Sequence, residues 1–163
     1  MERSLRDLLL QASDEELSAR CRLEFCRGSG NGGQKRNKTS SAARVVLLED
    51  ENFAAEDCSE RSQHRNRSCA LWKLKRLIAF EVRCLPALAP PRPECALEHE
   101  EYPLNLAYLL DVLEEQQYDH KKSAELCGLS TSGFLKLLRR DEELWTKVNT
   151  AREFRGSYKL KAN

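Results

Sequence analysis

Hydrophobic positions follow two different periods in the first half of the chain. Short alternating or clustered apolar runs, bounded by polar turns, predict strands at residues 21–27, 44–48 and 53–57. From residue 61 to residue 83 the apolar positions recur every three or four residues, which predicts one long helix. Its apolar stripe is Leu71, Leu74, Ile78 and Val82, and its cations Lys73, Lys75 and Arg76 are expected to face elsewhere. These elements predict a small α+β fold, a short mixed or antiparallel sheet backed by one long helix.

Two shorter helices are expected beside these strands. Ser13 and Glu16 have the spacing of a capping box, so a short helix is expected to begin there and to run toward Ala19. Asn37 can cap a second short helix, expected over residues 37–43. The two helices would flank the first strand and the segment that follows it.

A proline-rich segment separates two regions of the chain. All five prolines lie between Pro86 and Pro103, and proline both lacks a backbone donor and disfavours helix in the residue before it. Residues 86–103 are therefore expected to form an extended linker. It divides the chain into one domain at residues 1–85 and a second region at residues 104–163.

The region after the linker is expected to be all-α. Apolar spacing and turn residues predict helices at residues 104–116, 122–127, 131–139 and 142–155. The second and third would be joined by a turn at Gly128, in the manner of a helix-turn-helix. The residues expected to pack this pair are small or apolar: Ala124, Leu129, Phe134, Leu137 and Leu138.

Charge is distributed unevenly, although the net charge is only +1. Residues 20–83 carry fourteen Lys and Arg against eight Asp and Glu, and residues 121–163 carry ten against five. Residues 94–120 carry eight acids and neither Lys nor Arg. Such asymmetry indicates an anionic partner for the basic segments.

Composition argues against several classes of protein. No apolar stretch approaches the ~20 residues of a membrane span, and the N-terminus is too acidic for a signal peptide. The seven cysteines form no C-x-x-C pair, so neither a zinc site nor a redox site is expected. We expect a cytoplasmic monomer with reduced cysteines, and without metal, cofactor or membrane contact.

Residues 28–39 carry the strongest chemical signal, Gly-Ser-Gly-Asn-Gly-Gly-Gln-Lys-Arg-Asn-Lys-Thr. Four of the seven glycines fall within six residues, and positive charge follows them. Glycine lets a backbone approach another molecule closely, and the charge indicates that this molecule is anionic. The spacing also fits the dinucleotide-binding pattern G-x-G-x-x-G. In dinucleotide-binding proteins that pattern follows a buried apolar strand. The strand expected here carries Arg22 and Glu24, so we reject a dinucleotide-binding function for this loop.

Two blocks of the sequence resemble a known family. Residues 27–44, with the tripeptide Gly32-Gly33-Gln34, resemble the GGQ domain of class I peptide chain release factors and of related ribosome-rescue peptidyl-tRNA hydrolases. Residues 60–67, Glu-Arg-Ser-Gln-His-Arg-Asn-Arg, are similar to the family's stretch that leads into its last helix. The resemblance covers roughly residues 17–83.

The resemblance implies hydrolysis of the ester that joins the nascent peptide to P-site tRNA, in the peptidyl-transferase centre of the ribosome. Gly32, Gly33 and Gln34 would be the catalytic residues. The backbone N–H of Gln34 would meet the developing oxyanion, and its side chain would orient water, since an amide does not ionise near neutral pH. The alternative is a catalytically silent ribosome- or RNA-binding regulatory factor that keeps the fold, and the intact tripeptide favours the enzyme.

Two sets of residues are candidates for binding large-subunit ribosomal RNA. Those around the glycine loop are expected to bind phosphates: Arg27, Ser29, Lys35, Arg36, Asn37 and Lys38. Those of the second block, which either bond to the loop or contact RNA, are Arg61, Gln63, His64 and Arg65. The resemblance also implies a methyltransferase that acts on Gln34.

The length of the chain bears on the kind of release. Full-length release factors resemble one another in carrying a codon-recognition domain and an extra N-terminal domain, and neither fits in 163 residues. We therefore expect stop-codon-independent action on stalled ribosomes.

The helical region has three open interpretations: core packing alone, DNA binding, or docking on the ribosome through Lys136, Arg139, Arg140 and Lys147.

Overall fold

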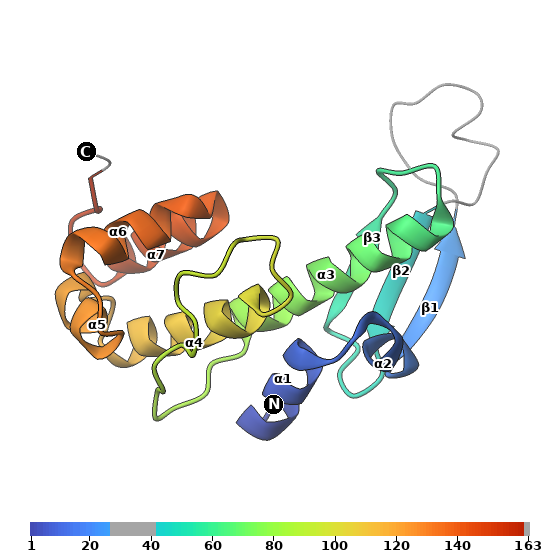
Figure 1. The fold of residues 1–163 in the computed structure, drawn as a ribbon, viewed down its shortest axis with the longest axis horizontal. Helices are drawn as coiled ribbons and strands as arrows, with labels where there is room; N and C mark the ends of the chain where they lie inside the picture. The colour runs from blue at the N-terminus through green and yellow to red at the C-terminus, as the bar shows by residue number, and fades with distance from the viewer. Residues whose placement is uncertain (27–41, 162–163) are drawn as a thin grey trace. The chain divides into compact units, whose positions relative to one another are not determined.

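The computed structural model describes residues 1–26 and 42–161 and divides into two compact units, Arg3–Glu81 and the residues from Val82 onward (Figure 1). In the described residues, the first unit contains a sheet and helices, and the second contains helices alone. The predicted fold class, α+β with a helical C-terminal region, is confirmed. No helix among the described residues is long and apolar enough to span a membrane.

The first unit contains a three-stranded antiparallel sheet in the order β1-β2-β3. Its strands are β1 (Cys21–Cys26), β2 (Ala42–Leu47) and β3 (Ala54–Asp57). Each strand lies within two residues of its predicted bounds. Arg22 and Glu24 of β1 form an ion pair at 3.0 Å and are half-exposed, so that one face of the strand is polar.

The prediction of a helix over residues 37–43 is wrong at Ala42 and Ala43, the two of these residues that the structure describes. Both are fully buried in β2, where they pair with β1. The preference of alanine for helix is below about 1 kcal/mol per residue, so pairing and burial override it. Residues 37–41 lie outside the described residues.

Helix α3 (Gln63–Glu81) covers one face of the sheet (Figure 1). Leu71, Leu74 and Ile78 are fully buried, which confirms the predicted stripe. The expected outward position of Lys75 is wrong: it is 6% exposed, and its Nζ donates to the carbonyl oxygen of Ala12. The long aliphatic stem of a lysine can cross apolar packing while the ammonium group reaches a polar partner.

Two short helices precede the sheet. Helix α2 (Asp14–Ala19) begins with the predicted capping box, in which the N–H of Glu16 donates to Ser13 Oγ (3.2 Å) and the N–H of Ser13 donates to Glu16 Oε2 (2.7 Å). Helix α1 (Arg3–Gln11) was not predicted, although Leu5, Leu8 and Leu9 stand at helical spacing. It buries Leu9 and Leu10 completely.

The second unit contains four helices close to their predicted positions: α4 (Tyr102–Glu115), α5 (His120–Leu126), α6 (Thr131–Arg140) and α7 (Glu142–Phe154). Gly128, between α5 and α6, has a φ of +66°, which glycine adopts without strain. Phe134 and Leu138 of α6, which were expected to pack the helix pair, are buried, and so are Leu106, Leu109, Leu110 and Leu113 of α4.

Side chains hold the proline-rich segment to the second unit. The N–H of Arg92 donates to Asn105 Oδ1 (2.6 Å), and the guanidinium of Arg140 donates to the carbonyl oxygen of Cys95 (2.9 Å). The Leu85–Pro86 peptide is cis. Residues 86–101 therefore pack as part of the helical unit although they lack long regular elements.

Asp57 at the end of β3 is buried and is held by one ion pair and two hydrogen bonds. Its Oδ2 lies 2.6 Å from Lys73 Nζ, and its Oδ1 accepts bonds from the N–H (2.9 Å) and Oγ (2.7 Å) of Ser59. Burial alone would raise the pKa of Asp57, but the bonds from Lys73 and Ser59 outweigh it and lower the pKa. The carboxylate therefore stabilises the fold fully above about pH 4, and this contribution is lost as the pH falls further.

Asp57→Asn is expected to reduce the free energy of unfolding of the first unit by about 1–2 kcal/mol at pH 7, and by less as the pH approaches 2. Urea unfolding would be followed by Trp72 fluorescence in a Trp145→Phe background, so that the reporter lies in this unit. Glu56→Gln, at an exposed position on the same strand, is the matched control. Equal effects of the two variants would contradict the account.

Tyr102→Phe is expected to destabilise the second unit by about 1–3 kcal/mol, because it removes a hydrogen bond to a buried carboxylate. The Tyr102 hydroxyl donates to Asp141 Oδ2 at 2.5 Å, and Asp141 also caps α7 through the N–H groups of Glu143 and Leu144. Trp145 fluorescence during urea unfolding, in a Trp72→Phe background, measures the change. Tyr158→Phe, at a 93% exposed position, is the control and should have little effect.

Candidate functional site

The glycine loop lies outside the described residues, and so do the predicted site residues within it. They are Arg27, Ser29, Gly32, Gly33, Gln34, Lys35, Arg36, Asn37 and Lys38. The structure does describe the residues on either side: β1 ends at Cys26 and β2 begins at Ala42. Cys26 and Ala42 are partners in the antiparallel ladder, so the loop leaves and re-enters the sheet at one pair of adjacent strand ends.

The segment between β3 and α3 is fixed by a buried asparagine. Asn66 is fully buried, its Oδ1 accepts the N–H of Glu60 (2.8 Å), and its Nδ2 donates to the carbonyl oxygen of Glu60 (2.9 Å). Ser59, just before, bonds to Asp57 at the end of β3. Asn66 lies in the second block, but its role cannot be predicted from the sequence, because an amide that pairs with one peptide unit has no sequence signature.

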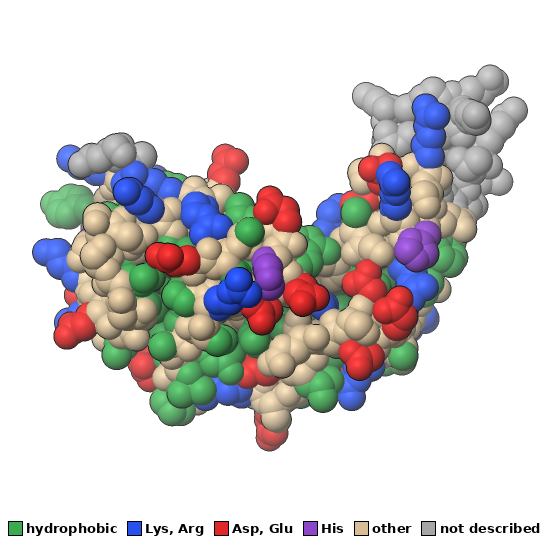
Figure 2. Space-filling view, viewed as in Figure 1, with side chains coloured by type: hydrophobic (Ala, Val, Ile, Leu, Met, Phe, Trp, Pro, Cys, Tyr) green, Lys and Arg blue, Asp and Glu red, His purple; other side chains and the backbone are tan. Residues whose placement is uncertain are grey.

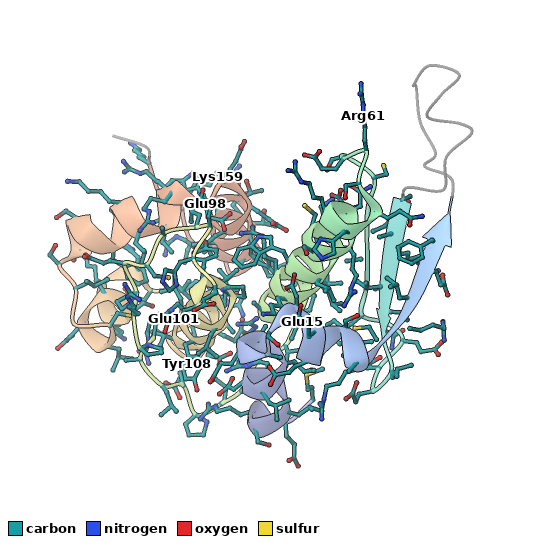
Figure 3. The ribbon with its side chains drawn as sticks, turned by 45° about the vertical axis from the view of Figure 1, so that its right-hand side comes forward. Glu15, Arg61, Glu98, Glu101, Tyr108 and Lys159 are labelled. Carbon is teal, nitrogen blue, oxygen red and sulfur yellow. The ribbon has the colours of Figure 1, made fainter. Side chains whose placement is uncertain are left out.

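The predicted RNA-binding residues of the second block are exposed and close together in the chain. Arg61 precedes α3, and Gln63, His64 and Arg65 form its first turn. Figure 3 shows Arg61 extending away from the start of the helix. Among the described residues, the Arg65 side chain forms a long ion pair with Glu60, at 4.0 Å. The dipole of a helix places partial positive charge at its N-terminus, so this end of α3 favours an anion.

Lys and Arg side chains are visible over this end of the first unit (Figure 2). The buried Asp57 does not oppose them as a free negative charge, because it is paired with Lys73. The sheet beneath is antiparallel and polar on one face, and neither property suits the dinucleotide-binding motif, which needs a buried parallel strand. The geometry therefore favours a cationic surface that flanks the glycine loop.

The four predicted docking residues of the second unit have different surroundings. The guanidinium of Arg139 donates to the carbonyl oxygen of Lys161 (2.9 Å) and lies 5.4 Å from the Trp145 ring. Arg140 donates to the carbonyl oxygens of Glu94 and Cys95. Both arginines therefore hold segments of their own unit together, whereas Lys136 is exposed on α6 and Lys147 is partly exposed on α7.

A metal centre and a reactive cysteine are two further kinds of site to consider among the described residues. These residues contain no group of three His, Cys, Asp or Glu side chains able to hold a metal. Burial, together with Glu49, raises the pKa of Cys21 to about 11, and burial raises that of Cys127 to about 11. Both thiols stay protonated at neutral pH and are poor nucleophiles.

Comparison with known proteins agrees with this geometry. Residues 14–85 match the RF-1 domain family. The chain is 36% identical over 77 residues to peptide chain release factor 2 of Campylobacter fetus, a match that covers 47% of this chain and 20% of the relative. It is 44% identical over 72 residues to peptide chain release factor 1 of Leptothrix cholodnii, covering 42% and 20%.

The match is confined to one part of each protein. The chain spans about a fifth of the length of these curated relatives. The matched residues begin at the first residue of α2 and end after α3, so they contain the sheet, the glycine loop and the covering helix. Residues 14–85 therefore form an RF-1 domain, in agreement with the predicted membership of the class I release factor GGQ-domain family.

Proposed function

We propose that this protein hydrolyses the ester bond of peptidyl-tRNA in the peptidyl-transferase centre of the ribosome. The observation that carries the proposal is the intact tripeptide Gly32-Gly33-Gln34, within the residues that match the RF-1 domain. Relatives that match over this domain are named peptide chain release factors. Translation termination on the ribosome, in the cytoplasm, is the corresponding setting.

The chemistry requires little more than a positioned water and a donor for the oxyanion. Water attacks the ester carbonyl carbon, and negative charge develops on the carbonyl oxygen until the tRNA ribose oxygen leaves. A backbone N–H at Gln34 can stabilise that charge, while the glycines at 32 and 33 remove side chains that would obstruct close approach. The Gln34 amide can orient the water but cannot remove its proton, so the proton passes to RNA or solvent.

The cationic surface at the start of α3 is proposed to contact large-subunit RNA beside the loop. Arg61, His64 and Arg65 are exposed there, and Asn66 fixes the backbone that carries them. Phosphate contacts of this kind position a protein on RNA without reading sequence. The loop cations Arg27, Lys35, Arg36 and Lys38 would extend the same surface.

The finer part of the proposal is that release does not require a stop codon, as in ribosome rescue. Each release-factor match covers only about a fifth of the relative, and the chain beyond the matched residues forms a helical unit. A second partner proposed here is a methyltransferase that modifies Gln34.

Gln34→Ala keeps the backbone N–H but removes the side-chain amide that orients the water. It is expected to reduce the rate of peptide release by about 10²–10³-fold, comparable to the loss of one oxyanion donor. Gly33→Ala is expected to be at least as severe, because a Cβ obstructs the backbone. Single-turnover release of labelled peptide from programmed ribosomes measures both effects.

Asn31→Ala, in the same loop but outside the tripeptide, is the matched control. Ribosome pelleting should show that all three variants bind like the unchanged protein. Undiminished release by both tripeptide variants would overturn the enzymatic role, and binding without release by the unchanged protein would establish the silent regulatory factor instead.

Arg61→Ala combined with Arg65→Ala is expected to weaken ribosome binding and to reduce its salt dependence. Each lost phosphate contact should lower the slope of log K against log salt concentration by about 0.7–0.9. Release at saturating ribosome concentration should change little. Arg22→Ala, at a half-exposed arginine on the polar face of β1, is the control, and an equal effect of this variant would contradict a specific surface at α3.

A further inference from the structure

We infer that the C-terminal end of α7 and the segment after it form a binding surface for unpaired RNA bases, with Phe154 and Tyr158 as stacking platforms. Phe154 is 91% exposed and Tyr158 is 93% exposed. The other large hydrophobic side chains exposed in the described part of this unit are leucines, between 49% and 57% exposed. Two almost completely exposed rings, four residues apart, therefore differ from ordinary surface leucines and require a separate explanation.

The rings belong to a segment whose backbone is anchored. Helix α7 ends at Phe154, Gly156 in the following turn has a φ of +73°, and the N–H of Ser157 donates to the carbonyl oxygen of Arg152 (2.8 Å). The Arg152 guanidinium then donates to the carbonyl oxygen of Tyr158 (3.0 Å). The N–H of Leu160 donates to Oδ1 of the buried Asn149 (2.7 Å).

Arg139 of α6 adds a further bond, to the carbonyl oxygen of Lys161. The segment after α7 is thus bonded to α6 and α7 at Ser157, Tyr158, Leu160 and Lys161, and still leaves the Tyr158 ring in solvent. Anchoring of this kind lowers the entropy cost of binding a partner, since the backbone is already ordered.

Charge around the rings matches a nucleic acid. Residues 152–161 carry four cations and one acid, Glu153. Arg155 is paired with Glu114 (2.6 Å), and Arg152 donates to the carbonyl oxygens of Tyr118 and Tyr158, so Lys159 and Lys161 are the cations that can meet a phosphate. Lys159, labelled in Figure 3, pairs with Glu153 at 3.2 Å, and both side chains are more than half exposed. Exposed pairs of this type contribute little, so a phosphate can replace the carboxylate.

Unpaired bases fit these observations better than other occupants. Proteins bind single-stranded nucleic acids by alternating aromatic rings that stack on bases with cations that meet phosphates. A duplex hides its base faces within the stack. A helix-binding groove would require one continuous apolar face, whereas the helix ends at Phe154 and the chain turns at Gly156 before it reaches Tyr158. A second copy of this surface would bring like charges together.

The test measures binding of fluorescent 12-nucleotide oligouridine to the full chain by anisotropy. Phe154→Leu and Tyr158→Leu keep an apolar side chain but remove the ring, and each should weaken binding about tenfold. Leu126→Ala, at a 49% exposed leucine in the same unit, is the control and should have no effect. RNA binding is read without ribosomes or hydrolysis, so this result is independent of the proposed release activity.

A second readout reports on stacking itself. In a Trp145→Phe, Trp72→Phe background, Tyr158→Trp should retain affinity, and the introduced indole should be quenched by oligouridine and much less by duplex RNA. Absence of quenching, or unchanged affinity of both leucine variants, would overturn the inference. So would a dimer, detected by sedimentation equilibrium, that Phe154→Leu and Tyr158→Leu dissociate.

Discussion

The packing of α3 against a sheet of three short strands is the constraint on which the rest of the first unit depends. A sheet this small has little apolar surface, so Leu71, Leu74 and Ile78 must supply a large part of the core from the helix side. The same helix binds the N-terminal region, because Lys75 Nζ donates to the carbonyl oxygen of Ala12, just after α1. Its first turn also fixes the preceding segment through Asn66. Helix α3 therefore positions the strand ends from which the glycine loop begins and to which it returns.

Much of this frame follows from the sequence, and the exceptions have physical causes. The α3 stripe and the capping box at Ser13 were predictable because each depends on residues close in the chain. Lys75 was placed on the wrong face, since periodicity treats a lysine as polar and ignores its stem. Ala42 and Ala43 were assigned to helix because single-residue preference says nothing of the partner strand that buries them.

Some features of the candidate site can likewise be predicted from the sequence, and others cannot. The tripeptide and its flanking cations can be identified from the sequence because glycine clustering is rare and chemically specific. The loop that contains them lies outside the described residues. Arg61, His64 and Arg65 were also identified, and they are exposed where a partner can reach them. What the sequence could not show is how these side chains are presented, since that depends on the bond between Asn66 and the peptide unit of Glu60. Nor could it show that Arg139 and Arg140 bond within their own unit.

The most direct test of the central claim compares three substrates of the unchanged protein under single-turnover conditions: ribosomes stalled on truncated mRNA, ribosomes with a stop codon in the A site, and free peptidyl-tRNA. The account predicts release from the truncated complex that is at least as fast as from the stop-codon complex, and no hydrolysis of free peptidyl-tRNA. Release that depends on the stop codon, or hydrolysis of free peptidyl-tRNA at a similar rate, would contradict it.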